Sequence, residues 1–385
     1  MERGIEMTEK YEKILTPLTL TNGAVLNYRI AMAPMVAQGS NSDGTVSEND
    51  LNFYSERSNV AGMIITGAAT ICERGKGFDN QLSISDDQYL DGLKKLAEAL
   101  KKDGNKAIIQ LYHGGREAKS SYERFGEVVA PSAVEFPFLP YVPRELTEEE
   151  IQKIVSDFGI AAKRAMDAGF DGVEIHGANH YLLQQFFSAY SNRRDDFLGN
   201  DLECRMNFPL AVVKEVKRVV KEYAKPDFIV GYRFSPEEIH EDTVGYTVED
   251  SLQLIDKIAE HELDYIHVSL FTKYNDKPAG KEKTFAELTK EVVGDRAAVV
   301  IVSNIFSADD ALDALKIADI AAIGRESLLE PKFVEKIAAG KADTIVSTLK
   351  PDRVGGLLFP EKLKEWFLEE GSALPPLPGD EFLKS

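Results

Sequence analysis

Short apolar runs alternate with amphipathic segments along most of the chain. The apolar residues of the amphipathic segments recur at helical spacing and predict helices near residues 86–102, 147–169, 204–222, 249–262, 308–317 and 326–339. The short apolar runs between them predict buried strands at Arg29–Ala33, Met63–Ala68, Ala107–Leu111, Gly172–Ile175, Phe228–Phe234, Tyr265–Val268, Ala298–Val302 and Ile320–Ile323.

This alternation predicts an α/β fold, a (β/α)8 TIM barrel. A doubly wound open sheet is the alternative, but no G-x-G-x-x-G motif opens any predicted helix. Ahead of the first barrel strand, Ile14–Pro34 reads as a hairpin that leads into that strand, because Asn22-Gly23 lies between two apolar runs. We therefore expect an N-terminal β-hairpin cap on the barrel.

Three segments follow from this reading. Residues 1–10 are predicted to be a flexible tail, 11–350 the barrel, and 351–385 a C-terminal extension packed on or near the barrel. Two loops, Gly114–Arg144 and Leu270–Thr284, exceed the usual length. Long βα loops of a barrel build the face that carries the active site, so we expect both to shape a binding site.

Composition narrows the class of protein. The 385 residues carry a net charge of −19, which argues against nucleic acid or an anionic membrane as the main partner. Cys72 and Cys204 are too few and too far apart for a disulfide framework, a zinc site or an iron–sulfur site. No metal is predicted, and reduced cysteines suit the cytoplasm. No signal peptide is visible, and no run reaches the roughly 20 apolar residues that cross a bilayer.

Polar residues gather after the fourth predicted strand. His176, Asn179 and Tyr181 follow the run DGVEI, and carboxyl ends of barrel strands face the active site. An imidazole, an amide and a phenol together can hold an electron-rich oxygen and deliver a proton. They lack the Ser or Cys nucleophile of acyl transfer. Glu174 is expected to face the barrel interior, whereas Tyr112, His113 and Arg116 are open between a site role and loop packing.

The remaining strand ends indicate a phosphorylated ligand with a flat ring. Ser303 and Asn304 follow the seventh strand, and Gly324-Arg325 opens a helix after the eighth, which is the usual phosphate position of a barrel. Gln110 and Arg233 offer amide and guanidinium groups to a ring edge. We expect Arg233 to need a partner inside the barrel. A phosphate group plus a polar ring edge describes flavin mononucleotide (FMN).

The blocks that carry these residues resemble those of the Old Yellow Enzyme family of flavin-dependent oxidoreductases. Its His-x-x-Asn/His-x-Tyr signature is matched at 176–181, and its Asn-x-Arg-x-Asp segment at 192–196. Further matches are RIAMAPM (29–35), IIQLYHGGR (108–116) and IGRESLLEPKF (323–333), in family order.

The resemblance implies an FMN enzyme that uses NADH or NADPH to reduce electron-poor C=C bonds in a small-molecule substrate. It implies that His176 and Asn179 bind the substrate oxygen, that Tyr181 gives the proton, and that hydride comes from flavin N5. It also implies flavin contacts from Ala33, Pro34, Met35, Ala68, Gln110 and Arg233, and phosphate contacts from Ser303, Asn304, Gly324 and Arg325.

Two departures from the family pattern matter. Val36 stands where a Cys or Thr usually hydrogen-bonds the flavin, so an altered redox potential is expected. Asn304 replaces a usual glycine in the phosphate turn.

The open alternatives are a flavin NADH oxidase, an amine or other dehydrogenase, a non-redox barrel lyase or isomerase, and a non-enzymatic flavin carrier. A homo-oligomer is possible, and His240, His261 and His267 are expected to be structural or surface residues.

Overall fold

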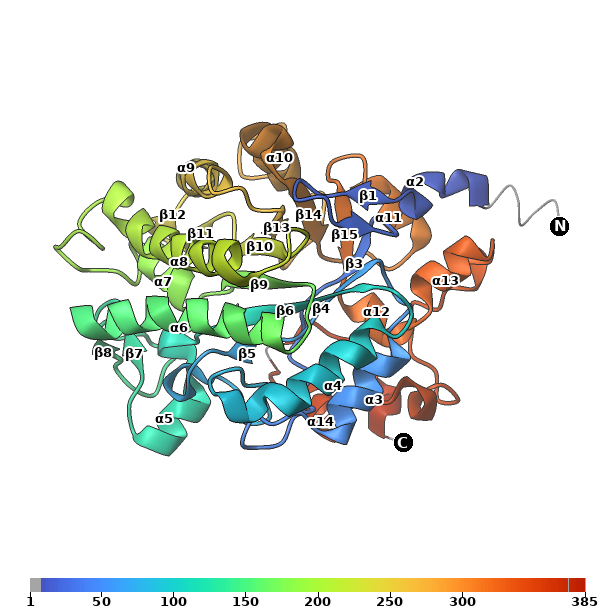
Figure 1. Ribbon diagram of the computed structural model, residues 1–385, viewed down its shortest axis with the longest axis horizontal. Coiled ribbons are helices and arrows are strands. Elements are labelled where there is room, and N and C mark those ends of the chain that lie inside the picture. The colour runs from blue at the N-terminus through green and yellow to red at the C-terminus, as the bar shows by residue number, and fades with distance from the viewer. Residues whose placement is uncertain (1–7, 373, 385) are drawn as a thin grey trace.

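Eight parallel strands close into a barrel in the computed structural model, which describes residues 8–372 and 374–384 (Figure 1). The last strand pairs with the first, so the predicted (β/α)8 barrel is confirmed and the open sheet is excluded. The strands in order around the barrel are β3 (Ile30–Met32), β4 (Met63–Ile65), β6 (Lys106–Tyr112), β9 (Gly172–Gly177), β10 (Ile229–Phe234), β13 (Tyr265–Val268), β14 (Ala298–Val302) and β15 (Ile320–Ile323).

The second predicted strand is interrupted. It continues only as the short β5 (Ala69–Thr70), which pairs with β6. The backbone of Met35 lies so close to Gly67 that a Cβ there would meet the Met35 carbonyl oxygen at 2.4 Å. The glycine thus lets the ends of the first two strands approach each other.

Helices surround the barrel (Figure 1). The predicted helix at 326–339 is wrong as one element, because Pro331 cannot continue a helix and separates α12 from α13. The outer helices are α3 (Glu48–Glu56), α4 (Leu90–Lys101), α6 (Glu148–Asp167), α8 (Leu202–Tyr223), α9 (Val248–Ala259), α10 (Phe285–Val293), α11 (Ala308–Ala314), α12 (Arg325–Leu329) and α13 (Phe333–Ala338).

Capping boxes set where several helices begin. The predicted box of Thr147 and Glu150 opens α6, with both reciprocal bonds present. The same pattern at Thr284 and Glu287 opens α10, a helix that the apolar spacing had not indicated.

The predicted hairpin is confirmed in place but is shorter than expected. A short helix, α2 (Glu12–Leu15), takes up Ile14, and only β1 (Leu18–Thr19) and β2 (Val25–Leu26) pair. Leu20, Ala24 and Leu26 pack against side chains of the barrel interior. The hairpin therefore lies against one end of the barrel core, where it shields apolar surface from water.

The loops and the C-terminal segment add smaller elements. They are α5 (Lys119–Phe125), β7 (Val129–Ala130), β8 (Arg144–Glu145), α7 (Leu182–Phe187), β11 (Glu238–His240), β12 (Thr243–Tyr246) and α14 (Glu361–Leu368). In the part of the chain that the structure describes, no helix has the length and apolar character to cross a bilayer. Residues 1–7 of the predicted tail lie outside the described residues, and the division into segments stays a prediction.

Candidate active site

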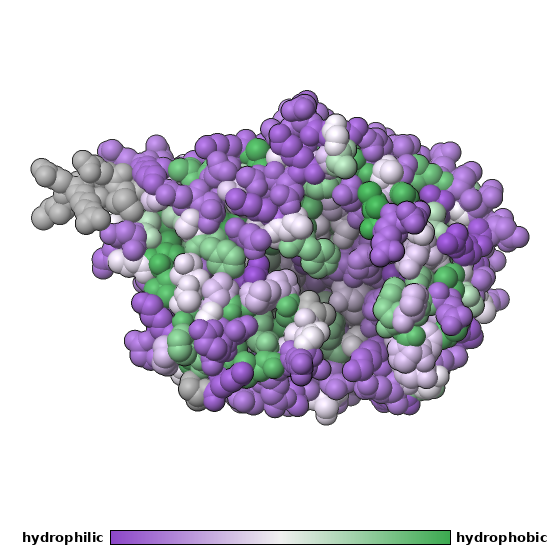
Figure 2. Space-filling model, turned by 180° about the vertical axis from the view of Figure 1, so that it is seen from behind, coloured by the Kyte–Doolittle hydropathy of each residue, from purple (hydrophilic) through white to green (hydrophobic). Residues whose placement is uncertain are grey.

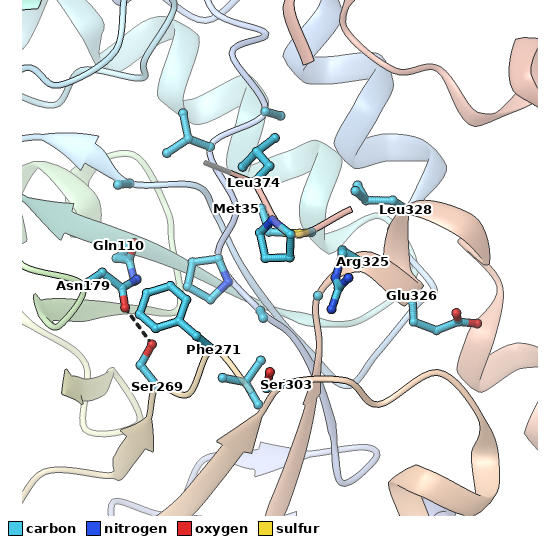
Figure 3. A pocket seen from close by; sticks show the side chains of 18 of the residues that line it. Met35, Gln110, Asn179, Ser269, Phe271, Ser303, Arg325, Glu326, Leu328 and Leu374 are labelled. Atoms are coloured by element: carbon cyan, nitrogen blue, oxygen red, sulfur yellow. Dashed lines mark hydrogen bonds between the residues drawn. The ribbon is translucent and has the colours of Figure 1, made fainter. Parts of the chain in front are cut away.

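A cavity lies where the carboxyl ends of the strands meet, and Figure 2 shows one face of the molecule hollowed near its middle. In Figure 3, Gln110 and Asn179 lie on one side of the cavity and Arg325 on the other. All of the predicted site residues line it: Ala33, Pro34, Met35, Val36, Ala68, Gln110, His176, Asn179, Tyr181, Arg233, Ser303, Asn304, Gly324 and Arg325. The structure thus brings these residues together, while their roles stay predictions.

His176 is a neutral hydrogen-bond donor toward the cavity. Its side chain is buried, and its Nδ1 accepts a bond from the backbone N–H of Ala178 at 3.3 Å. That bond assigns the proton to Nε2. Burial, with smaller contributions from the positive charge of Arg233 and from His267, lowers the pKa of His176 well below its ordinary value. The ring therefore stays uncharged at neutral pH and can donate from Nε2.

Asn179 is held so that its amide N–H2 group is free to donate. Its Oδ1 accepts a bond from the Ser269 hydroxyl at 2.9 Å (Figure 3), and its backbone N–H donates to Ser235 Oγ at 3.0 Å. Its φ of 56° lies in the left-handed region that asparagine tolerates better than most residues. Ser269 belongs to the site but was not predicted, since a lone serine after a strand carries no local signal.

Tyr181 completes this side of the cavity. Its ring centre lies 4.9 Å from that of His176 and 4.5 Å from that of Tyr112, with both pairs edge to face. Burial, reinforced by the charge of Glu117, raises the pKa of the Tyr181 phenol well above its ordinary value. The phenol thus keeps its proton at neutral pH, as a proton donor must.

A buried polar group lies beneath the cavity inside the barrel. Glu174 is fully buried, as predicted, and accepts bonds from Gln110 Nε2 at 2.6 Å and His267 Nδ1 at 2.9 Å. Although burial opposes ionisation, His267, Arg233 and Gln110 together lower the pKa of Glu174. Because the Gln110 amide nitrogen is bonded to Glu174, its carbonyl oxygen is left to accept a bond from a ligand.

Arg233 lines the cavity, and the partner predicted for it has two candidates, the charge of Glu174 and a ligand in the cavity. Arg233 is 8% exposed, and its Nε has no hydrogen-bond partner among the described residues. Burial lowers the pKa of Arg233, and the negative charge of Glu174 partly offsets that effect. A buried unpaired donor is costly, at about 1–3 kcal/mol. An electron-rich ring edge in the cavity would satisfy it.

The opposite end of the cavity is tied together by hydrogen bonds. Arg325 donates to the Asn304 side chain and, at 2.6 Å, to the backbone carbonyl of Pro376. Asn304 has a φ of 51°, which explains how asparagine replaces the family's glycine, and Ser303 has a φ of 115°. A Cβ on Gly324 would point toward Met35 and Ala33, two other lining residues. The backbone around Gly324 is therefore open to a ligand.

The C-terminal segment supplies part of the cavity that sequence patterns did not indicate. Trp366, the only tryptophan of the chain, lines the cavity and packs on Phe78 with ring centres 5.3 Å apart. Phe271, which is 63% exposed, comes from a long loop. Other unpredicted lining residues are Ala37, Phe53, Leu270, Val302, Ile305, Phe306, Glu326, Leu328, Leu363, Phe367, Leu374 and Pro375.

Several residues left open by the sequence pack around the site without lining the cavity. Tyr112 and His113 are buried, and Arg116 is 1% exposed and lies over the Phe136 ring at 4.4 Å. The Asn-x-Arg-x-Asp segment connects two loops by hydrogen bonds. The Arg194 guanidinium donates to Asp196 Oδ2 at 2.7 Å and to the Leu146 carbonyl oxygen at 2.9 Å.

These groups fit FMN. Apolar residues such as Ala33, Pro34 and Ala68 offer flat walls to a ring, and Gln110 and Arg233 offer an acceptor and a donor to its polar edge. Arg325 lies at the other end, beside the open backbone of Gly324, and suits a phosphate. The unpaired Nε of Arg233 is the observation that favours a ligand with an electron-rich edge.

Comparison with known proteins shows the family to which the chain is similar. Residues 13–344 match the model of the NADH:flavin oxidoreductase / NADH oxidase family. A probable NADH-dependent flavin oxidoreductase, YqiG of Bacillus subtilis (strain 168), is 43% identical over 347 residues, which is 89% of this chain and 92% of the relative. An NADH:acrylate oxidoreductase of Vibrio harveyi is 40% identical over 84% of this chain, but the match spans only 33% of that relative. Morphinone reductase, solved in complex with tetrahydroNAD, has a TM-score of 0.74 at 29% identity, covering 86% of this chain and 91% of that one.

Proposed function

The chain belongs to the NADH:flavin oxidoreductase / NADH oxidase family, and we propose that this FMN- and NAD(P)H-dependent oxidoreductase reduces electron-poor C=C bonds. Membership of an oxidoreductase family argues against the non-redox alternatives, a lyase or an isomerase. The substrate class is the part that we propose. It is supported by the groups around His176 and by the name of the Vibrio relative, an NADH:acrylate oxidoreductase.

In the proposed reaction, His176 and Asn179 bind the carbonyl or nitro oxygen of the substrate. Their hydrogen bonds stabilise the negative charge that develops on this oxygen as the β-carbon is attacked. Bound FMN supplies the hydride for that carbon. Tyr181 then gives a proton to the α-carbon, and a phenol that is protonated at neutral pH suits this step.

The observation that best supports this proposal is the preset polarity of two donors. His176 is neutral with its proton assigned to Nε2, and Asn179 is fixed by Ser269 with its amide N–H2 free. Two donors that converge on one side of a cavity, next to a protonated phenol, suit an acceptor with a polarised oxygen. Neither donor would be needed for electron transfer to oxygen alone.

An anaerobic half-reaction experiment tests the proposal. NADH or NADPH is first used to bleach the flavin band near 450 nm, as flavin chemistry requires. The reduced protein is then mixed with enones, nitroalkenes and α,β-unsaturated carboxylates, with the saturated analogue of each compound as the control. We expect rapid reoxidation by at least one unsaturated class and none by its saturated analogue. Rapid reoxidation by oxygen but by none of the unsaturated compounds would instead support the NADH oxidase alternative.

A further inference from the structure

Two histidines and a glutamate meet outside the cavity. His180, Glu238 and His240 each offer one ligand atom, and these atoms all lie within 4.8 Å of one another. His180 follows β9 between Asn179 and Tyr181, while Glu238 and His240 share the short strand β11. Of the three histidines that are not buried, two are thus gathered around one carboxylate.

The carboxylate at the centre of this group is buried. Glu238 is 2% exposed, and its oxygens lie 3.1 Å from His240 Nε2 and 3.7 Å from His180 Nδ1. Buried carboxylates in proteins are paired with other groups or coordinate a metal.

A second set of contacts fixes the orientation of these groups. The Gln184 amide donates to Glu238 Oε2 at 2.7 Å and accepts from the backbone N–H of His180 at 2.9 Å. His180 has a φ of 65°, a conformation that costs a residue with a Cβ about 1–2 kcal/mol. Hydrogen bonds that orient the ligating side chains are typical of metal sites. Strained backbone is typical of functional sites.

The spacing suits a transition metal. Ligand bonds of about 2.0–2.2 Å in a tetrahedral zinc site place the ligand atoms about 3.3–3.6 Å apart. His240 Nε2 lies 3.1 Å from one oxygen of Glu238 and His180 Nδ1 lies 3.7 Å from the other, while one ligand atom from each residue lies within 4.8 Å of the others. The three groups would therefore move slightly closer together around an ion. The two histidine side chains are 36% and 35% exposed, which leaves a side open for water as a further ligand.

We propose that His180, Glu238 and His240 bind a divalent transition-metal ion of the zinc class. Two imidazoles and one carboxylate, without cysteine, favour such an ion over calcium or magnesium. Because His180 lies between Asn179 and Tyr181, the ion would fix the loop that carries both. No metal was predicted from the sequence, because His180 lies far along the chain from Glu238 and His240 and the three residues follow no known ligand spacing.

Metal analysis of the FMN-loaded protein, made without a histidine tag, tests the proposal. The protein is treated with EDTA, incubated with zinc chloride, desalted and measured by mass spectrometry. We expect about one zinc per chain, held by three protein ligands with water in the remaining position. The zinc content of His240→Ala and of Glu238→Gln should be lower by about tenfold or more. His261→Ala, which changes a histidine on another element, should keep the wild-type zinc content.

A second test, the melting temperature with and without zinc, does not require that Glu238→Gln folds. Zinc should raise the melting temperature of the wild-type holoenzyme and leave that of His240→Ala unchanged, because only a ligand that binds the native state stabilises it. Less than about 0.1 zinc per chain in the wild type, or equal retention by His240→Ala, would overturn the proposal.

Discussion

Replacing Arg325 by alanine should weaken FMN binding through the phosphate group alone. The guanidinium is half-buried, lies 5.1 Å from the centre of the Phe306 ring and is bonded to Asn304 and to the Pro376 carbonyl. It is therefore held in place before a ligand arrives. A charged hydrogen bond contributes about 1.5–3 kcal/mol.

We expect Arg325 to contribute the lower end of the range for a charged hydrogen bond. Arg325 must exchange its bond to the Pro376 carbonyl, at 2.6 Å, for one to the phosphate, so only the difference contributes to affinity. A loss of about 1.5 kcal/mol corresponds to a roughly tenfold higher Kd. The negative charge of the whole chain, −19, adds a general repulsion of FMN that is nearly the same in the variant.

The single tryptophan provides the assay. Trp366 lines the cavity, so bound flavin should quench its fluorescence when the apoprotein is titrated. Riboflavin, which has no phosphate, is the ligand control, and Arg296→Ala is the matched variant, since Arg296 precedes β14 and pairs with Asp256. The Kd for FMN should rise about tenfold in Arg325→Ala, with no change for riboflavin. If both ligands weaken equally, the arginine supports the fold of the site and does not bind phosphate.

Four further predictions concern the polar groups of the site. Tyr181→Phe should slow C=C reduction by about 10²–10⁴-fold while flavin reduction by NADH stays unchanged, and equal slowing of both half-reactions would exclude a proton-donor role. Val36→Thr should raise the FMN midpoint potential by about 10–30 mV, because a hydroxyl donor worth about 0.5–1.5 kcal/mol favours the electron-rich reduced ring; an unchanged potential in spectroelectrochemical titration would contradict this. Burial lowers the pKa of His176 and raises that of Tyr181, so the rate of C=C reduction should stay level from about pH 6 to about pH 9, and a step near 6.5 would show that His176 titrates. Glu174→Ala should lower the free energy of unfolding in urea by about 3–5 kcal/mol, since Gln110 and His267 lose a buried charged acceptor; a loss below about 1 kcal/mol would argue against an ionised Glu174.

Local patterns in the sequence were enough to predict the barrel. Strand positions such as Ala298–Val302 follow from short apolar runs, and the start of α6 follows from Thr147 and Glu150, whose bonds involve only neighbouring residues. Strand ends also indicated several lining residues, such as Gln110 and His176, because parallel strands of a barrel deliver their carboxyl ends to one face. Ala68 was predicted only through the family resemblance. The helix predicted at 326–339 failed where Pro331 interrupts it, although that residue was visible in the sequence.

Contacts between distant segments were decided only by the tertiary structure. Ser269 fixes Asn179 across two loops, and His267 reaches Glu174 from a strand that is not its neighbour in the barrel. The C-terminal segment brings Trp366 to the cavity, and folding gathers His180 and His240 around Glu238. The sequence by itself determined which elements form, because periodicity and capping act over a few residues. Only the closed barrel determined which side chains meet, because hydrogen bonds and charges depend on distance in space and not along the chain.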